Sequence, residues 1–432
     1  MVRQKGKLAR SSIPRDLGRL AGPGARDTLG GLVDERLTMT NPPEPSRDGG
    51  VVVRRVDYPT HTEWFLTGLP TVADGVSAAS VAATPIFEAL ARILATERIA
   101  VLQEKVYALR SAYASIQHAR RAALAFAGIT EDWPVTLLEG TPARGAAFAG
   151  VQLWGVTAGE RQRVETVVWR GRPLGREWSG PDFRALLLAS VDAAAWGEVP
   201  AASAPDQARR VFEAVTAALG ERGYSYRQVA RTWIYLSHIL ECYDGFNQVR
   251  NAHHTVAGLA TPGKGSFPAS TGIQARHDRE ECLMDVLAID ARPGGGLQVR
   301  PIMRSDRQGE AFAYGSAFAR GVVIERDGRK VIHVSGTASI DAAGQSTHPG
   351  DAAAQCRETL LSIGAVLEHE GATLADIVQT TLFAKTDAVA RTCRDVTRRL
   401  GLQALPFVEI IADVCRPELL VEIEAVAVSA SP

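Results

Sequence analysis

Two glutamates stand on an otherwise apolar run close to the C-terminus, Val421-Glu422-Ile423-Glu424. Side chains alternate between the two faces of a β-strand, so both carboxyls are predicted to point to the same side. Burial among apolar neighbours raises the pKa of a carboxyl, which suits a general acid that must hold its proton near neutral pH. The competing interpretation is an edge strand whose carboxylates face solvent or pair with a cation.

Arginines would accompany such an acid if the ligand carries carboxylates, because the planar guanidinium binds a carboxylate through two hydrogen bonds. Arg250 shares one face of a predicted helix with Tyr243 and Asn247. Each candidate also has a structural alternative, which is a solvated charge, amphipathic packing or a turn. The candidate ligand-binding residues are Arg231, Tyr243, Arg250, Ser270, Thr271, Tyr314, Arg320 and Arg416.

Cysteine and histidine give weaker signals. The five cysteines are scattered without a CxxC pair, which argues against a disulfide framework or structural zinc and favours a reducing cytoplasm. Cys415 adjoins Arg416 shortly before the Glu422 strand, so we expect it in the same cleft, with its pKa lowered by the guanidinium. The alternative for Cys415 is an inert buried thiol. His253 and His254 lack the spacing of metal ligands, and we expect no metal.

The composition limits the function classes. The chain has 432 residues, 46% of them hydrophobic and 22% charged, as in ordinary globular proteins. Its 48 basic and 48 acidic residues balance, so neither a nucleic acid nor an anionic membrane is an expected partner. No apolar run approaches the roughly 20 residues that span a bilayer. Residues 1–50 lack an apolar stripe and a signal-peptide core, so we expect a disordered arm, with Met39 as an alternative start.

A fixed order of helices and strands repeats along the chain, which decides the fold class. Three pairs of segments carry the repeat: 229–236 with 377–384, 267–274 with 405–411, and 281–290 with 420–428. The last third predicts strands 321–326 and 330–335 around an Asp-Gly turn, a helix from Asp351, strand 375–385, helix 387–400, and strands 407–414 and 419–428. This ββαβαββ order defines an α+β unit with its helices on one face of a mixed sheet.

The middle third predicts the same order, and the first third a weaker copy. The middle copy has strands 166–169 and 186–191, helix 207–222, strand 229–236, helix 243–257, and strands 272–274 and 282–290. In the first copy, helix 85–97 is expected before all other elements, followed by strand 101–109, helix 112–127, and strands 135–138 and 148–156. The predicted divisions are an arm (1–50) and three units (51–158, 159–296 and 297–432).

These motifs resemble known families. The last unit resembles the YjgF/RidA family through Ser335-Gly336-Thr337, the turn at 371–378, and the strand 421–428. A longer series of motifs resembles the chorismatases, and the resemblance covers residues 160–430 well and residues 50–160 loosely. These motifs are 231–236, Tyr243, 246–250, 268–273, 314–320, 335–341, 348–351 and 413–416. The resemblance implies three YjgF-like units in a pseudo-trimeric arrangement. It also implies a cytoplasmic monomer without a cofactor, acting on the small molecule chorismate.

By resemblance, Glu422 would protonate the enolpyruvyl methylene of chorismate so that pyruvate is released. Cys415 together with Gly336 resembles members that form 3-hydroxybenzoate for secondary metabolism, whereas a small apolar residue at the cysteine resembles hydrolases that form a dihydroxycyclohexadiene carboxylate. The sequence departs from the family at Cys242, where a tryptophan is expected, and at His253-His254, where an aromatic pair is expected.

Two further functions remain open. A RidA-like imine deaminase is disfavoured because Val408 stands where those proteins carry a carboxylate-binding arginine, although Arg416 could substitute. A non-catalytic binding protein on the same scaffold would bind small molecules without turnover.

Overall fold

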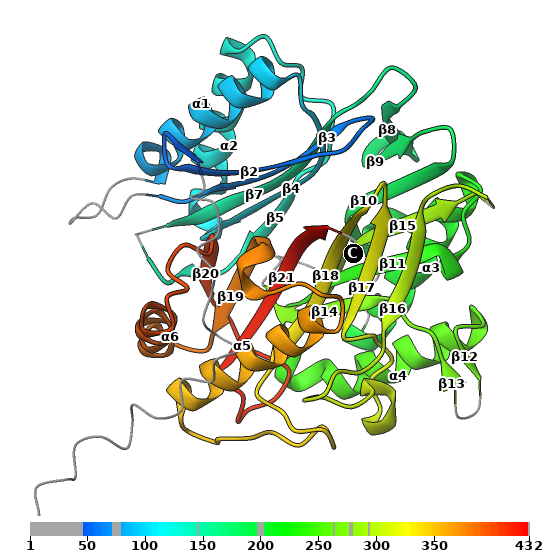
Figure 1. Cartoon of the computed structure of the whole chain (residues 1–432), viewed down its shortest axis with the longest axis vertical. Coiled ribbons are helices and arrows are strands. Elements are labelled where there is room, and N and C mark those ends of the chain that lie inside the picture. Colours follow the sequence, from blue (N-terminus) through cyan, green and yellow to red (C-terminus); the bar gives the residue numbers. More distant parts are fainter. Residues whose placement is uncertain are drawn as a thin grey trace, which may run out of the picture. The chain divides into compact units, whose positions relative to one another are not determined.

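The chain folds into three large β-sheets that share one strand order, as the computed structural model shows (Figure 1). The structure describes residues 46–70, 79–144, 147–196, 203–261, 264–275, 280–292 and 294–430. All of them belong to one compact unit. The predicted N-terminal arm lies outside the described residues, apart from its last five positions.

Numbered by their place in the repeat, the five shared strands of each sheet lie in the order 1-2-5-3-4. The first sheet holds β2 (Val51–Asp57), β3 (Thr62–Gly68), β7 (Phe148–Thr157), β4 (Ala100–Ala108) and β5 (Thr136–Glu139). The second holds β9 (Arg172–Ser179), β10 (Phe183–Asp192), β15 (Cys282–Ala291), β11 (Val229–Leu236) and β14 (Ala269–Gln274). The third holds β17 (Gly321–Arg326), β18 (Arg329–Ala338), β21 (Val421–Ala430), β19 (Ile377–Ala384) and β20 (Phe407–Ile411).

The pairing directions repeat as well. In each sheet the pair formed by the third and fourth strands is parallel, namely β4/β5, β11/β14 and β19/β20. An outer antiparallel strand is added to each: β1 (Ser46–Asp48), β8 (Arg163–Trp169) and β16 (Gln298–Ile302). The short β6 (Thr141–Pro142) extends the third sheet from the first unit, and β12 (Ala260–Thr261) and β13 (Lys264–Gly265) form a small hairpin.

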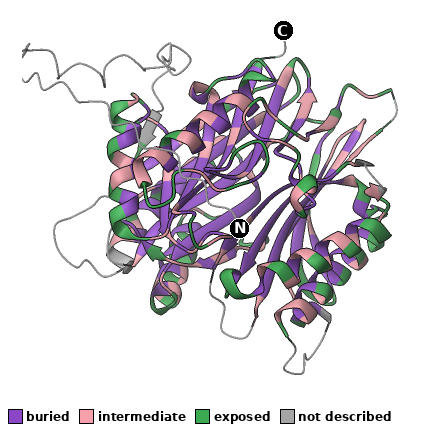
Figure 2. Cartoon of the chain, turned by 90° about the horizontal axis from the view of Figure 1, so that it is seen from below, coloured by how far each residue is buried: buried purple, intermediate pink, exposed green. Residues whose placement is uncertain are grey.

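Each unit also contributes two long helices. They are α1 (Ala79–Glu97) and α2 (Tyr113–Phe126), α3 (Ala204–Glu221) and α4 (Ile239–Val256), and α5 (Ala352–Glu368) and α6 (Asp387–Arg399). Asp351 caps α5 by accepting a hydrogen bond from the Ala354 amide at 3.0 Å, which confirms the predicted start of this helix. Figure 2 shows exposed residues on the helices, whereas the strands are mostly buried.

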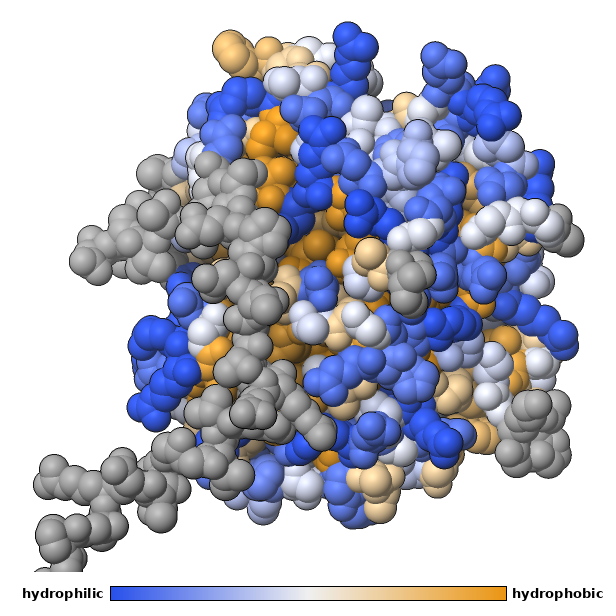
Figure 3. Space-filling view, in the orientation of Figure 1, coloured by the Kyte–Doolittle hydropathy of each residue, from blue (hydrophilic) through white to orange (hydrophobic). Residues whose placement is uncertain are grey.

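The sheets are buried on both faces. One face of the second sheet packs on its own helices, for example through Leu186, Val211 and Met284. The other faces of all three sheets share a single core, to which Tyr107, Trp233 and Phe383 belong. Burying apolar residues on both faces ties the units together, because each sheet's inner face needs its neighbours to exclude water. On the face seen in Figure 3, hydrophilic residues accordingly cover most of the described surface.

The α+β class and the three ββαβαββ units are confirmed, and three details of the prediction are wrong. The predicted opening strand 166–169 of the middle unit is the outer strand β8, and the first shared strand of this unit is β9, which was not predicted. Strands β2 and β3 precede α1, so the helix at 85–97 does not come first and the first unit is a complete copy. The third strand of the last unit begins at Ile377 rather than 375, because 374–376 form a short 3-10 turn capped by Thr373. None of the described helices is long and apolar enough to cross a membrane.

Candidate active site

Glu422 lies where the second and third units meet. Strand β21 presents it at the end of its pairing with β18, where it lies opposite Ala338. The residue is only 4% exposed, and no described group hydrogen-bonds to its carboxyl. Burial raises the pKa of Glu422 to about 8, assisted by the charge of Glu424 and opposed by Arg231. The side chain therefore holds a proton at neutral pH, as a general acid requires.

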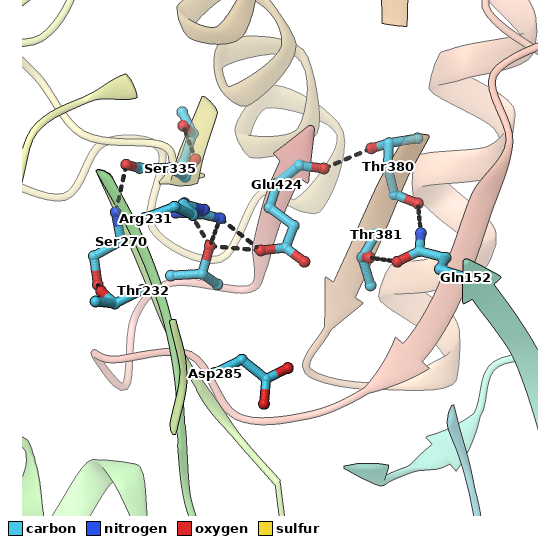
Figure 4. Close-up of polar contacts among 12 residues, drawn as sticks. Gln152, Arg231, Thr232, Ser270, Asp285, Ser335, Thr380, Thr381 and Glu424 are labelled. Atoms are coloured by element: carbon cyan, nitrogen blue, oxygen red, sulfur yellow. Dashed lines mark hydrogen bonds and ion pairs between the residues drawn. The ribbon is translucent and has the colours of Figure 1, made fainter. Parts of the chain in front are cut away.

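Glu424, two residues along the same strand, has the opposite environment. Its Oε2 accepts hydrogen bonds from Arg231 Nη2 at 2.9 Å and from Thr271 Oγ1 at 2.6 Å. Arg231 is 1% exposed, and its guanidinium is directed at this glutamate (Figure 4). Its placement differs from the expected carboxylate clamp, and the geometry makes it the counter-ion of Glu424.

Gly336 makes room for the acid. It lies in a β-bulge, because the β18–β21 register shifts between Val334 and Thr337. A Cβ atom at Gly336 would stand 2.0 Å from Glu422 Oε1 and 3.1 Å from Thr271 Cγ2. Its amide donates to Thr271 Oγ1 at 3.0 Å, so the bulge also orients the threonine that holds Glu424. A larger residue at this position would therefore displace the Glu422 carboxyl, and the restriction comes from this close approach, not from the backbone conformation.

Cys415 shares this region with Glu422 and Tyr243. Burial raises the pKa of its thiol to about 12, and the charge of Glu422 raises it further, whereas Arg416 and a hydrogen bond with Tyr243 act in the opposite direction. The expectation of a thiol pKa lowered by Arg416 is therefore wrong, because desolvation outweighs the guanidinium. Cys415 is a neutral neighbour of the acid rather than a thiolate nucleophile.

A second group of predicted residues converges on Phe318. The guanidinium carbons of Arg250 and Arg320 lie 5.5 and 5.4 Å from the centre of its ring. Tyr314 accepts a hydrogen bond from Arg320 Nη2 at 2.6 Å. The ring of the same tyrosine has the Arg416 guanidinium 5.7 Å from its centre. The structure thus brings three of the four predicted arginines together.

Tyr243 lies between the two groups: burial raises its pKa, the charges of Cys415 and Glu422 raise it as well, and Arg250 opposes them. Ser270 has a structural role: its amide donates to Ser335 Oγ at 2.9 Å, and its hydroxyl accepts from Thr232 (Figure 4). The first bond seats β14 of the second unit against β18 of the third, and the second joins β14 to β11 within the second unit. The parallel bridge between Ala269 and Ala319 strengthens the same junction.

Sequence reasoning missed a buried polar cluster where the three units meet. Gln152, Asp285 and Glu424 occupy equivalent places, paired with Lys105, Trp233 and Thr381 on the neighbouring strands. Gln152 donates to the Thr380 carbonyl, and Asp285 accepts from Thr136 and from the Ser190 amide. Figure 4 shows Gln152 and Glu424 directed toward this region from different sheets. Aligning the closing strands of the three repeats would have revealed the cluster.

Lys105 is the least expected member of that cluster. Its ammonium lies 3.9 Å from the centre of the Trp233 ring, beside a cavity of about 20 Å³ that Arg231, His333 and Glu424 also line. Such a cavity has room for about one water molecule. Burial lowers the pKa of Lys105 to about 8, opposed by Glu424 and Asp285. Lys105 therefore lies among Arg231, Glu424 and Asp285, with the two carboxyl groups favouring its charged form.

The positions at which the sequence departs from the chorismatase pattern lie in the helical layer. Cys242 is buried in the core of the second unit beside Cys282. His253 stacks on Phe212 at 4.8 Å, and His254 on Phe267 at 5.6 Å. Within the described ranges, no three His, Cys, Asp or Glu side chains are grouped as metal ligands would be.

The fold and this junction define a class: a single chain of three YjgF-like units with one buried acid between the second and the third. Residues 316–429 match the family described as endoribonuclease L-PSP. A crystal structure of a chorismatase covers 86% of this chain and all of its own chain, with 18% identity and a TM-score of 0.57. This likeness establishes the fold.

A chorismatase of Streptomyces rapamycinicus is 28% identical over 272 residues, which are 55% of this chain and 78% of that protein. The protein is thus chorismatase-like in sequence and in fold.

Proposed function

We propose that the protein cleaves chorismate to pyruvate and 3-hydroxybenzoate, with Glu422 as the general acid. The observation that carries the proposal is a buried carboxyl without a described hydrogen-bond partner, whose raised pKa keeps it protonated at neutral pH. The chorismatase relative and the shared fold support the substrate class.

The reaction begins with transfer of the Glu422 proton to the methylene carbon of the enol ether, which leaves an oxocarbenium ion. The oxygen of the ring hydroxyl next to the ether then bonds to the ring carbon that carries the ether, while the bond from this carbon to the ether oxygen breaks and pyruvate leaves with that oxygen. The hydroxyl proton returns to Glu422, and the oxygen-bridged ring isomerises to aromatic 3-hydroxybenzoate. No second reactant is needed, because 3-hydroxybenzoate and pyruvate together contain the atoms of chorismate. We assign binding of the carboxylates to Arg250, Arg320 and Arg416, with Tyr314; their mutual proximity supports this assignment.

Hydrolysis is the alternative within the class. It consumes one water and gives a dihydroxycyclohexadiene carboxylate with pyruvate. Cys415 and Gly336 favour the aromatic product by resemblance, and the Cys415 thiol, with its pKa raised to about 12, is a much weaker acid than Glu422. A RidA-like deaminase has less support, since Val408 is fully buried and offers no cation.

The test is to incubate the purified protein with chorismate, to follow pyruvate and to separate ring products by chromatography and mass spectrometry. Pyruvate with 3-hydroxybenzoate supports the proposal, and pyruvate with a non-aromatic diol supports the hydrolase. Ligand binding without pyruvate would leave a non-catalytic binding protein. We expect activity in the cytoplasm from one chain, because all proposed site residues belong to the second and third units and all five cysteines are free.

The pH dependence follows from the protonation state of the acid. Only protonated Glu422 is active, so kcat/KM is expected to be level well below pH 8, to be about half of that level near pH 8 and to fall above it, because the pKa of Glu422 in the ligand-free protein is about 8. Stopped assays of pyruvate release between pH 6 and 10 would measure this fall in activity. An activity that stays level up to pH 10 would assign proton transfer to another group.

Substituting Gly336 by alanine is expected to lower kcat by about 100-fold, because displacing a catalytic group by about 1 Å has effects of this size. The new methyl group would overlap the Glu422 carboxyl, whose oxygen stands 2.0 Å from the Cβ position. Gly364→Ala in α5 is the matched control, since its Cβ would meet nothing within 4 Å. Equal activity of both variants would show that Glu422 does not depend on this bulge.

A further inference from the structure

A second cleft lies between the third and first units, whereas the candidate active site lies between the second and third. At the active site, α4 and β14 of the second unit face β18 and β21 of the third. At the second cleft, α6 and β20 of the third unit face the first unit near β2 and β7 (Figure 1). The cavity has a volume of about 450 Å³. Pockets of this size hold small organic molecules.

The two clefts share an arginine at the same helical position. Arg250 lies 11 residues after Ile239, the first residue of α4, and Arg398 lies 11 residues after Asp387, the first residue of α6. Arg398 lines the second cleft. The repeat has therefore retained a cation facing both junctions.

The second cleft carries an excess of positive charge. Glu409 of β20 is buried and accepts hydrogen bonds from Arg144 Nη2 at 2.6 Å and from Arg394. One carboxylate thus orients two guanidinium groups at the cavity wall. Each guanidinium has five N–H donors, so most remain for a ligand. Arg398 adds a third cation, whose own partner is Asp395 at the surface.

The rest of the wall is apolar. Leu69 of the first unit and Leu382, Leu405 and Phe407 of the third line the cavity. Arginines beside an apolar wall complement a molecule with a carboxylate on a compact hydrophobic body.

This cleft lacks the acid. Glu422 pairs with Phe383, the next-to-last residue of β19. The equivalent residue of β4 is Tyr107, which pairs with Gly150. A Cβ atom at Gly150 would lie 2.7 Å from the Gly68 carbonyl oxygen, so no larger side chain fits. The position equivalent to the general acid is thus held by a residue without a side chain.

We propose that this cleft binds a small cyclic carboxylate and does not transform it. Binding follows from the cavity and its arginines and is independent of the reaction at the other junction. The lack of turnover rests on the proposed role of Glu422.

Equilibrium dialysis with labelled benzoate tests the proposal by counting sites per chain in the full-length protein. The proposal requires a benzoate site that Arg398→Ala weakens at least about tenfold, through loss of a charge-assisted contact, and that Arg250→Ala retains. Arg398→Glu should abolish the same site. Arg399→Ala, an exposed arginine on the same helix that does not line the cavity, is the matched control and should bind like the wild type.

Benzoate binding that is unchanged in Arg398→Ala and Arg398→Glu would overturn the proposal, as would binding that Arg250→Ala removes completely. Pyruvate release from chorismate is measured separately. A protein that releases no pyruvate but keeps the Arg398-dependent site would refute the proposed reaction and leave this site intact.

Discussion

Replacing Glu422 by glutamine is expected to lower kcat for pyruvate release by about 10²–10⁴-fold, the usual contribution of a general acid. Glutamine keeps the size of the side chain and removes the transferable proton. Because no described group hydrogen-bonds to the Glu422 carboxyl, the substitution should leave folding and ligand binding intact. A coupled assay of pyruvate together with ligand titration of the same preparation separates catalysis from binding.

The matched control is Glu368→Gln, which changes an exposed glutamate at the end of α5 in the same unit. It should retain wild-type kcat. If Glu422→Gln also retained full activity, the acid would have to be another group, and the role of the β18–β21 bulge would need reassignment.

The largest expected effect on stability comes from Arg231→Met. The substitution leaves Glu424 buried without its guanidinium partner, since Arg231 Nη2 lies 2.9 Å from Glu424 Oε2 and their side chains are 2% and 9% exposed. Removing one partner of a buried ion pair is expected to lower the free energy of unfolding by about 3–5 kcal/mol. Urea denaturation followed by tryptophan fluorescence would measure the change.

Arg209→Met serves as the control, because the Arg209–Asp206 pair is about half exposed on both sides. This substitution should lower the free energy of unfolding by about 0–1 kcal/mol. The double variant Arg231→Met/Glu424→Leu should recover most of the loss, because it removes both charges together. If Arg231→Met lowered the free energy of unfolding no more than the control, Lys105 alone would neutralise Glu424.

Much of the fold could be predicted from sequence where apolar residues alternate and turns are marked. Strand 229–236 and the hairpin around Asp327-Gly328 are of this kind. Strand β9 was missed because it carries charges inside the protein. Arg176 donates to the Val101 carbonyl, and Glu177 accepts from Arg222 and Tyr224. A strand with buried charged residues lacks the alternation of apolar and polar residues from which strands are predicted.

The candidate site was only partly predictable for a related reason. Glu422 could be found because its apolar neighbours are adjacent in sequence. Whether Arg231 faces a ligand depends on Glu424, nearly two hundred positions away, and the pKa of Cys415 depends on burial by another unit. Such partners are set by packing between units, which local periodicity does not report.

Because the three units belong to one chain, a single substitution changes only one of them. In a symmetric homotrimer, every substitution is imposed on all three interfaces at once. Here Glu422, Gly150 and Leu283 occupy equivalent places, yet each belongs to a different interface. One interface can gain an acid, another can keep a cavity without it, and the third can carry the buried side chain of Leu283 at that place. Selection can therefore act on one interface without affecting the other two.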